Sequence, residues 1–275
     1  MLDTVFLNGN YLPKADAALN VADLSILRGY GIFDYFRYAN GRPRFMADHI
    51  ARFQRSAAYM DLPMPISGDD LAEVVHQLIE RNGKGDGGIR FVMTGGYALD
   101  GYTPGTPNLM AMAYAFKAPP KRQFEQGARI LVHSYERQLP AAKTIDYIEG
   151  IRLLPQLKAG NYDYPLYLDR QGYLRESDRS NYMIIRDGVL ITPIDEVLLG
   201  ITRMHTLRLA KQLGIPTEER PIKLEEFKGA DEALLTSSTK GIMPITSADG
   251  QAIADGQPGP ITQRMMAAWP DYVKQ

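Results

Sequence analysis

Two short segments carry groups that could bind a phosphate. Gly200, Ile201 and Thr202 lie where a loop is expected to enter a helix, and free backbone N–H groups at a helix start attract anions. Four consecutive hydroxyl side chains, residues 236–239, follow an apolar stretch typical of a buried strand. Hydroxyl runs are also common in turns, and capped helix starts are common everywhere. Each segment alone is therefore equally explained as ordinary local structure.

A lysine and a carboxylate accompany these segments in chain order. Lys143 supplies an amine and Glu176 a carboxylate, and both precede the two segments in the chain. Most lysines are solvated, and Glu176 follows a polar stretch, 169–173, where an exposed carboxylate would be unremarkable. Taken together in this order, the four features are more informative than any one of them.

Hydrophobic periodicity predicts the elements that must position these residues. Helical spacing predicts helices at 47–61, 68–81 and 203–213 and a final helix from about Pro260. We expect Ser67 with Asp70 to cap the second helix, and Thr202 and Gly214 to cap the third. Alternation and turn signals such as Asn-Gly and Asp-Gly predict strands at 4–7, 33–38, 89–94, 108–116, 128–135, 165–169, 182–185, 189–192 and 234–237.

This order of strands and helices predicts a mixed α+β or α/β protein of two domains. Pro119-Pro120 interrupts the pattern, so we place a linker at 117–122. The small domain is then 1–116, and the large domain, 123–275, carries Lys143.

Composition excludes several classes of function. The chain of 275 residues has no cysteine, which removes disulfides and thiolate chemistry, and its four histidines lack ligand spacing, so no metal site is expected. A net charge of -1 argues against nucleic-acid binding, and no apolar run is long enough to span a membrane. The N-terminus lacks the features of a signal peptide, so we expect a cytoplasmic protein.

Six segments form one recognisable series along nearly the whole chain. They are Gly31-Ile32-Phe33-Asp34, Asp48-His49-Ile50-Ala51-Arg52-Phe53, Pro140-Ala141-Ala142-Lys143, Glu176 with Asn181-Tyr182, Asp187-Gly188-Val189-Leu190-Ile191-Thr192-Pro193, and Leu199-Gly200-Ile201-Thr202-Arg203. The series resembles the class IV (fold-type IV) aminotransferases. That family holds branched-chain aminotransferases, D-amino-acid transaminases and aminodeoxychorismate lyase, so the resemblance implies a two-domain fold-type IV enzyme that uses pyridoxal 5'-phosphate (PLP).

The resemblance assigns a role to each chemical group. Lys143 would hold PLP as a Schiff base and later move a proton between the substrate α-carbon and the cofactor. Glu176 would keep the pyridine nitrogen protonated, which makes the ring an electron sink. Arg52 would bind the phosphate. The remaining cofactor contacts implied are the backbone N–H groups of Ile201 and Thr202, the hydroxyl of Ser238, and Tyr147 on the ring oxygen.

The substrate region departs from the patterns of the known subfamilies. Where D-amino-acid transaminases carry Arg-x-His, this chain has Asp100-Gly101-Tyr102. Where branched-chain enzymes carry Tyr-x-Arg, it has Gly88-Ile89-Arg90, and Tyr35 stands where they tend to have glycine.

Instead of these motifs, the chain carries three arginines in the segments predicted to lie near the substrate. Arg28, Arg37 and Arg90 are candidates for binding substrate carboxylates, because a guanidinium pairs bidentately with a carboxylate. Arg37 could equally be structural, tied to Asp34 or Glu80. Phe33, Tyr35 and Thr239 complete the predicted substrate-binding set.

The resulting hypothesis is a D-amino-acid transaminase that acts on small amino acids and 2-oxo acids such as D-alanine, D-glutamate, pyruvate and 2-oxoglutarate. A branched-chain L-aminotransferase is the alternative, followed by a lyase of the aminodeoxychorismate lyase type. An inactive PLP-binding homologue stays open because Ser177 and Lys240-Gly241 depart from the family pattern. The resemblance also implies a homodimer whose active sites are completed by the partner chain.

Overall fold

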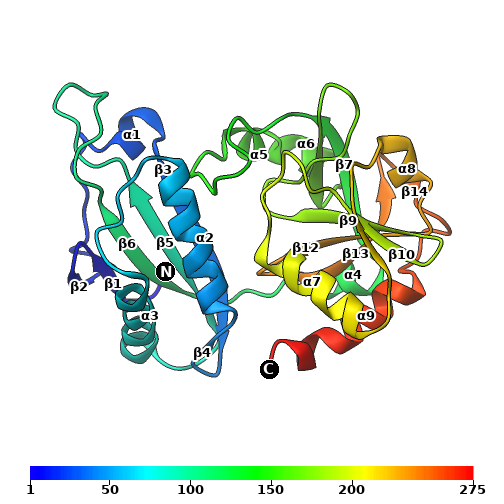
Figure 1. Ribbon diagram of the computed structural model, residues 1–275, viewed down its shortest axis with the longest axis horizontal. Coiled ribbons are helices and arrows are strands. Elements are labelled where there is room, and N and C mark those ends of the chain that lie inside the picture. Colours follow the sequence, from blue (N-terminus) through cyan, green and yellow to red (C-terminus); the bar gives the residue numbers. More distant parts are fainter. Residues whose placement is uncertain (275) are drawn as a thin grey trace. The chain divides into compact units, whose positions relative to one another are not determined.

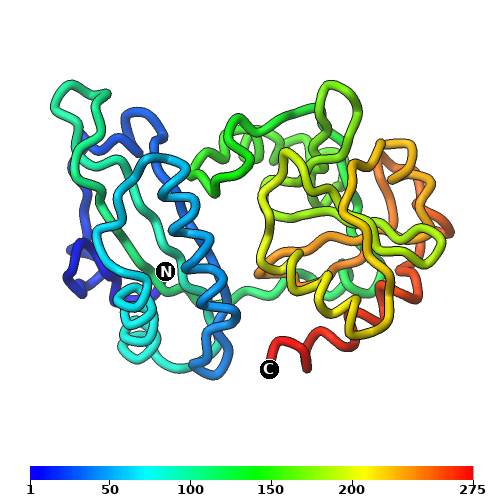
Figure 2. Tube along the Cα trace, in the orientation of Figure 1, coloured from blue at the N-terminus to red at the C-terminus, as the bar shows by residue number. Residues whose placement is uncertain are grey.

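The computed structural model describes residues 1–274, and its chain forms two compact units. Unit 1 comprises Met1–Lys117 and Ala141–Asp146, and unit 2 comprises Ala118–Pro140 and Tyr147–Gln275. The chain trace runs through most of unit 1 before it enters unit 2 (Figure 2). Mixed helices and strands in both units confirm the predicted fold class.

Unit 1 is built on a six-stranded antiparallel sheet in the order β2-β1-β6-β5-β3-β4 (Figure 1). Two helices, α2 and α3, cover one face, where Phe53 of α2 packs against Phe91 at 5.4 Å between ring centroids. Ser67 and Asp70 form the predicted capping box of α3. The elements are β1 (Thr4–Leu7), β2 (Asn10–Pro13), α1 (Leu24–Arg28), β3 (Gly31–Ala39), β4 (Arg42–Pro43), α2 (Met46–Tyr59), α3 (Gly68–Asn82), β5 (Gly87–Thr94) and β6 (Leu109–Ala115).

Unit 2 is built on an eight-stranded mixed sheet whose main path runs β11-β10-β9-β12-β13-β7-β8, with β14 paired to β13. Its core contains Ile130, Leu166, Ile184, Leu235 and Met243, all buried. The elements are α4 (Lys121–Glu125), β7 (Ala128–Ser134), α5 (Ile148–Arg152), α6 (Leu154–Ala159), β8 (Tyr164–Leu168), β9 (Asn181–Arg186), β10 (Val189–Thr192), α7 (Ile201–Gln212), β11 (Thr217–Glu219), α8 (Leu224–Lys228), β12 (Glu232–Ser237), β13 (Gly241–Ala248), β14 (Gln251–Ala252) and α9 (Pro260–Tyr272).

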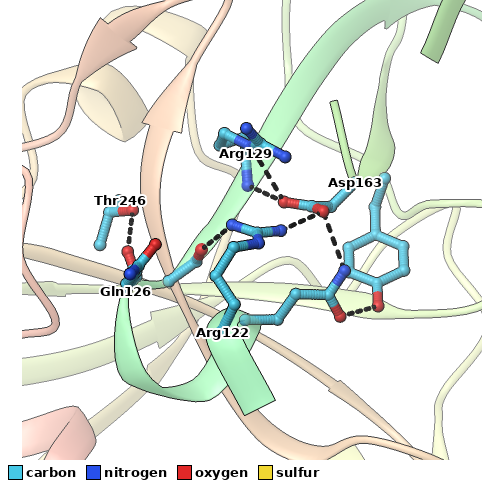
Figure 3. A network of polar contacts seen from close by, with 8 residues as sticks. Arg122, Gln126, Arg129, Asp163 and Thr246 are labelled. Carbon is cyan, nitrogen blue, oxygen red and sulfur yellow. Dashed lines mark hydrogen bonds and ion pairs between the residues drawn. The ribbon is translucent and has the colours of Figure 1, made fainter. Parts of the chain in front are cut away.

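A polar network fixes the start of unit 2 (Figure 3). Asp163 accepts hydrogen bonds from Arg122 and from the backbone and side chain of Arg129. Thr246 donates to the backbone carbonyl of Gln126 at 2.8 Å. Residues 118–122, part of the predicted linker 117–122, lie in unit 2, and α4 begins within them at Lys121.

Two local predictions differ from the structure. The N-cap of α7 is Gly200 rather than Thr202, because the helix begins at Ile201, two residues before the predicted start at residue 203. Residues 141–146 pack with unit 1, whereas the predicted boundary placed Lys143 in the second domain. The physical reason is backbone pairing with β3, described below. The assignment of functional domains stays a prediction.

Candidate active site

The Lys143 segment is bound to unit 1 through its backbone. Phe33 N–H donates to the carbonyl of Lys143 at 2.9 Å, and Ile145 N–H donates to the carbonyl of Gly31 at 3.1 Å. Ser56 of α2 accepts a hydrogen bond from Lys143 N–H. The side chain of Lys143 is partly buried, and its Nζ lies 4.6 Å from the centroid of the Phe33 ring. The segment is thus held like a short added strand that presents the amine beside an aromatic ring.

Arg52 lies in a buried cluster with Asp34 and His49. Its Nε and Nη2 each donate to a carboxylate oxygen of Asp34 at 2.8 Å, a bidentate pair. The ring of His49 contacts the same carboxylate at 2.7 Å. Burial alone would raise the pKa of Asp34, but the charges of Arg52 and His49 hold it well below its usual range. The carboxylate fixes the guanidinium in one orientation.

The sheet face opposite the Asp34 side chain carries Phe33, Tyr35 and Arg90. Arg90 is exposed, and its guanidinium carbon lies 5.4 Å from the Phe33 ring centroid, 6.0 Å from that of Tyr35 and 5.5 Å from that of Tyr114. A Cβ at Gly88 would meet the hydroxyl of Tyr35 at 2.0 Å, so only glycine allows Tyr35 to lie there. Phe33 contacts both Lys143 and Arg90, which brings three of the predicted residues together.

The other two arginines lie in different surroundings. Arg37 stacks on the ring of Phe116 at 3.3 Å, and its nearest carboxylate is Asp86 at 3.9 Å. The expected structural partners, Asp34 and Glu80, are therefore not the ones it has. Arg28 ends α1, is exposed, and donates from Nη1 to the carbonyl of the preceding residue at 2.9 Å.

Glu176 of unit 2 is a buried carboxylate, 5% exposed. One oxygen accepts from Arg137 Nη1 at 2.8 Å, and the other accepts from Leu198 N–H at 3.2 Å. Burial alone would lower the pKa of Arg137. The charge of Glu176 and its hydrogen bond together have the larger effect, so the pKa of that guanidinium is raised. Each carboxylate oxygen has two acceptor sites, so Glu176 retains capacity for a further donor such as a protonated ring nitrogen.

Tyr147 precedes α5 and stays a neutral phenol at neutral pH. Burial raises its pKa well above the ordinary value, against the opposing charge of Arg137. A neutral hydroxyl can donate a hydrogen bond to an anionic oxygen.

The start of α7 has the geometry expected of an anion cradle. Gly200 is the N-cap and provides no side-chain cap, so the N–H groups of Ile201 and Thr202 are not satisfied by a capping side chain. A Cβ at Gly200 would meet the amide oxygen of Asn181 at 2.1 Å. The Asn181 amide in turn donates to the carbonyl of Leu198 at 2.8 Å. This close approach requires glycine.

The hydroxyl run forms the turn between β12 and β13. Ser237 Oγ and Thr239 Oγ1 are 3.2 Å apart, and Lys240 N–H donates to Ser237 Oγ at 3.2 Å. Ser238 is partly exposed in this turn.

The predicted residues thus fall into two sets, one in each unit. Unit 1 holds Lys143, Arg52, Phe33, Tyr35, Arg37, Arg90 and Arg28, and unit 2 holds Tyr147, Glu176, Ile201, Thr202, Ser238 and Thr239. The donor chemistry fits PLP: a guanidinium and helix-start N–H groups suit its phosphate, and a buried carboxylate suits its ring nitrogen. Among residues 1–274, no group of three or more potential ligands could hold a metal ion.

Sequence reasoning missed three residues with evident roles. Asp34 was considered as part of a motif and as a possible partner of Arg37, although a lone carboxylate in an apolar strand should have suggested a buried ion pair. Arg137 belongs to no motif and is recognisable only through its contact with Glu176. Lys240 was noticed only as a departure from the family pattern, although it follows the hydroxyl run directly.

Comparisons with known proteins agree with this chemistry. The family model described as "Amino-transferase class IV" matches residues 31–248. A D-alanine aminotransferase of Staphylococcus epidermidis is 30% identical over 98% of this chain and 98% of its own length.

Two solved structures are branched-chain enzymes. The branched-chain amino acid aminotransferase of Escherichia coli has a TM-score of 0.93 at 27% identity, covering 99% of this chain and 95% of that one. The branched-chain aminotransferase of Thermoproteus uzoniensis has a TM-score of 0.89 at 31% identity, covering 98% and 94%. The chain therefore belongs to the class IV aminotransferases and is a PLP-dependent transaminase.

Proposed function

We propose that this transaminase acts on D-amino acids and that arginines bind the substrate carboxylates. D-Alanine and D-glutamate are the proposed amino donors, and pyruvate and 2-oxoglutarate the acceptors. The observation that carries the proposal is the placement of Arg90, an exposed cation surrounded by Phe33, Tyr35 and Tyr114, with Lys143 on the same Phe33 ring. A guanidinium stacked on aromatic rings is oriented in advance for a carboxylate.

The chain's own residues would divide the chemistry as follows. PLP, when bound, supplies an electron sink for the charge that develops at the substrate α-carbon. Lys143 would move a proton between the α-carbon of the substrate and the cofactor. Glu176, fixed by Arg137, holds the proton on the ring nitrogen. Arg52, fixed by Asp34, binds the phosphate, with help from the N–H groups at the start of α7.

Tyr35 supports the D-amino-acid assignment over the branched-chain one. Its ring is held over Gly88 on the same sheet face as Arg90, where we expect it to crowd a pocket meant for a branched side chain. The branched-chain alternative is favoured by the similarity to branched-chain enzymes. The two functions therefore differ in a measurable preference for substrate.

The direct test is to add single amino acids to the purified PLP-loaded protein and record its visible spectrum. D-Alanine and D-glutamate should convert the yellow lysine-bound cofactor to the colourless amine form, and Lys143→Ala should abolish this. Conversion by L-leucine at an equal or greater rate than by D-alanine would move the assignment to the branched-chain enzyme. Pyruvate released from an amino substrate without any amino acceptor would indicate a lyase.

A second test separates the carboxylate site from general surface charge. Arg90→Met should raise the KM for D-alanine at least about tenfold, because a charged hydrogen bond contributes ~1.5–3 kcal/mol. Arg81→Met is the matched control, since Arg81 is also exposed and stacks on an aromatic ring, Tyr11, at 4.5 Å. Equal effects of the two substitutions would refute the assignment of Arg90.

Arg28 is proposed to serve the active site of a partner chain. It ends a helix whose surroundings expose large apolar side chains, among them Ile26 (58%), Leu99 (107%) and Tyr102 (77%), as expected of a surface that self-associates. Mixing inactive Arg28→Met with inactive Lys143→Ala chains, then refolding together, should restore activity, because the hybrid dimer regains one intact site. Restoration would be absent if Arg28 served its own chain.

A further inference from the structure

Lys240 is a buried amine that none of the steps above uses. It follows the hydroxyl turn at the start of β13 and is only 8% exposed. Its Nζ is 3.0 Å from Ser180 Oγ and 4.2 Å from the ring centroid of Tyr164. The hydrogen-bond partner is thus a neutral hydroxyl rather than a carboxylate. A buried lysine so placed costs free energy, which invites a functional explanation.

Ser180 belongs to the turn that immediately follows Glu176. Ser177 N–H donates to the carbonyl of Ser180 at 2.8 Å, and Glu176 and Asn181 pair across the base of the turn. Both serines are almost fully buried. Lys240 therefore binds the Ser177–Ser180 turn. The residue just before this turn is Glu176, whose carboxylate is proposed to pair with the cofactor nitrogen.

The residues that flank this turn are connected to the phosphate cradle. Leu198 N–H donates to Glu176, and the amide of Asn181 donates to the carbonyl of Leu198, beside the start of α7. On its other side, Lys240 is continuous with the turn that contains Ser238. One amine thus joins two segments, each of which carries proposed cofactor contacts.

We propose that Lys240 is a positioning residue for cofactor binding, whose amine holds the Ser177–Ser180 turn against the hydroxyl turn and thereby fixes Glu176. This inference rests on the proposed role of Glu176 at the ring nitrogen. Lys240 itself touches no reacting atom.

The charge of Lys240 makes this contact sensitive to pH. Burial and, to a smaller extent, the charge of Arg179 lower the pKa of Lys240 to about 7, against the opposing charge of Asp178. Tyr164, the other polar group facing it, stays neutral because burial raises its pKa to about 12. The amine therefore gains its charge as the pH falls through neutrality, while its aromatic and hydroxyl partners stay uncharged.

The test measures PLP binding by the apoprotein rather than turnover. Trp269, the only tryptophan in the chain, packs against Gly241, the residue after Lys240, so its fluorescence reports directly on this region. Lys240→Met should weaken PLP binding about tenfold, the effect of ~1.4 kcal/mol, and should flatten the pH dependence of the Kd around pH 7. Lys223→Met is the matched control, because Lys223 Nζ lies 3.8 Å from the centroid of a tyrosine ring in the same unit but is more exposed.

A second variant distinguishes positioning from a merely structural contribution. Ser180→Ala should weaken PLP binding to a similar extent, and the double variant should be no weaker than either single one, because both substitutions remove the same contact. Hydrogen exchange of the backbone amides of Ser177–Asn181 should rise in both. If Lys240→Met fails to fold, Ser180→Ala alone decides by the same two measurements.

Two results would overturn the proposal: PLP binding by Ser180→Ala within about twofold of the wild type, or fully additive effects in the double variant. Glu176→Gln separates this inference from the function on which it rests. If Glu176→Gln weakens binding and the Lys240 and Ser180 variants do not, only the role of Lys240 is wrong. If Glu176→Gln binds PLP normally with an unchanged spectrum, the role of Glu176 is wrong, and with it the proposed action of Lys240 through that residue.

Discussion

Replacing Asp34 by asparagine removes the charge that fixes Arg52 without changing the shape of the side chain. Asp34 is fully buried, and it accepts two hydrogen bonds from Arg52 and one from His49. Asparagine cannot balance the guanidinium charge, and breaking a buried pair costs about 3–5 kcal/mol. In a chain of this size each kcal/mol lowers the Tm by roughly 2–4 °C, so Asp34→Asn should melt roughly 10 °C below the wild type.

The assay is thermal unfolding of the apoprotein followed by circular dichroism, because bound phosphate would supply a substitute anion for Arg52. Asp3→Asn is the control: Asp3 also pairs with a cation, Lys14, but is 93% exposed, so its loss should cost less than about 1 kcal/mol. The double variant Asp34→Asn with Arg52→Met should recover part of the lost stability, since no unpaired charge remains. A melting temperature of Asp34→Asn within a few degrees of the wild type would refute the idea that this carboxylate holds Arg52.

The pH dependence of the same cluster has a definite sign. The pKa of Asp34 is lower in the folded protein than in the unfolded chain. Its stabilising contribution is therefore fully present above the ordinary carboxylate pKa of about 4 and is lost progressively as the pH falls below that value. Asp34→Asn should remove this part of the acid sensitivity.

Two further predictions concern unit 2. Because the pKa of Lys240 falls to about 7 from 10.5, its burial costs on the order of 5 kcal/mol below pH 7 and nothing above pH 10.5. Lys240→Met should therefore unfold at higher denaturant concentration than the wild type near pH 6, with the advantage shrinking as the pH rises, and a constant difference would contradict the shift. Gly200→Ala should weaken PLP binding at least about tenfold, because its Cβ would meet the amide oxygen of Asn181 at 2.1 Å. Gly85→Ala, where nothing lies within 4 Å, should bind PLP like the wild type in the same fluorescence titration.

Local patterns predicted most of the elements that build the two sheets. The alternation around Phe33 and the capping box at Ser67 both correspond to observed structure, because their causes lie within a few residues. The pairing of Lys143 with β3 could not be predicted in this way, since backbone hydrogen bonds between distant segments leave no periodic signal. For the same reason Arg137 escaped notice, although it binds a residue that the motifs did identify.

The sequence also did not predict which residues the charged side chains contact. The structural alternative for Arg37 was a pairing with Asp34 or Glu80. Asp34 instead pairs with Arg52 of α2, and Arg37 lies on the other side of the strand against Phe116. Strand alternation places the two on opposite faces, so that part of the error was avoidable. The stacking on Phe116 depends on how β3 and the end of β6 align, which only the three-dimensional structure provides.

The attachment of the Lys143 segment to unit 1 has a consequence for the order of assembly. Lys143 and its partner Ser56 are 87 residues apart in sequence. The sheet and helices of unit 1 therefore leave the ribosome well before residues 141–146, the segment that completes this unit. Loop closure of that length is entropically unfavourable until the receiving edge already exists. Lys143, the proposed nucleophile, is therefore among the last parts of unit 1 to dock. A nascent or partly folded chain would therefore keep the Lys143 amine away from the Phe33 ring until the rest of unit 1 has formed.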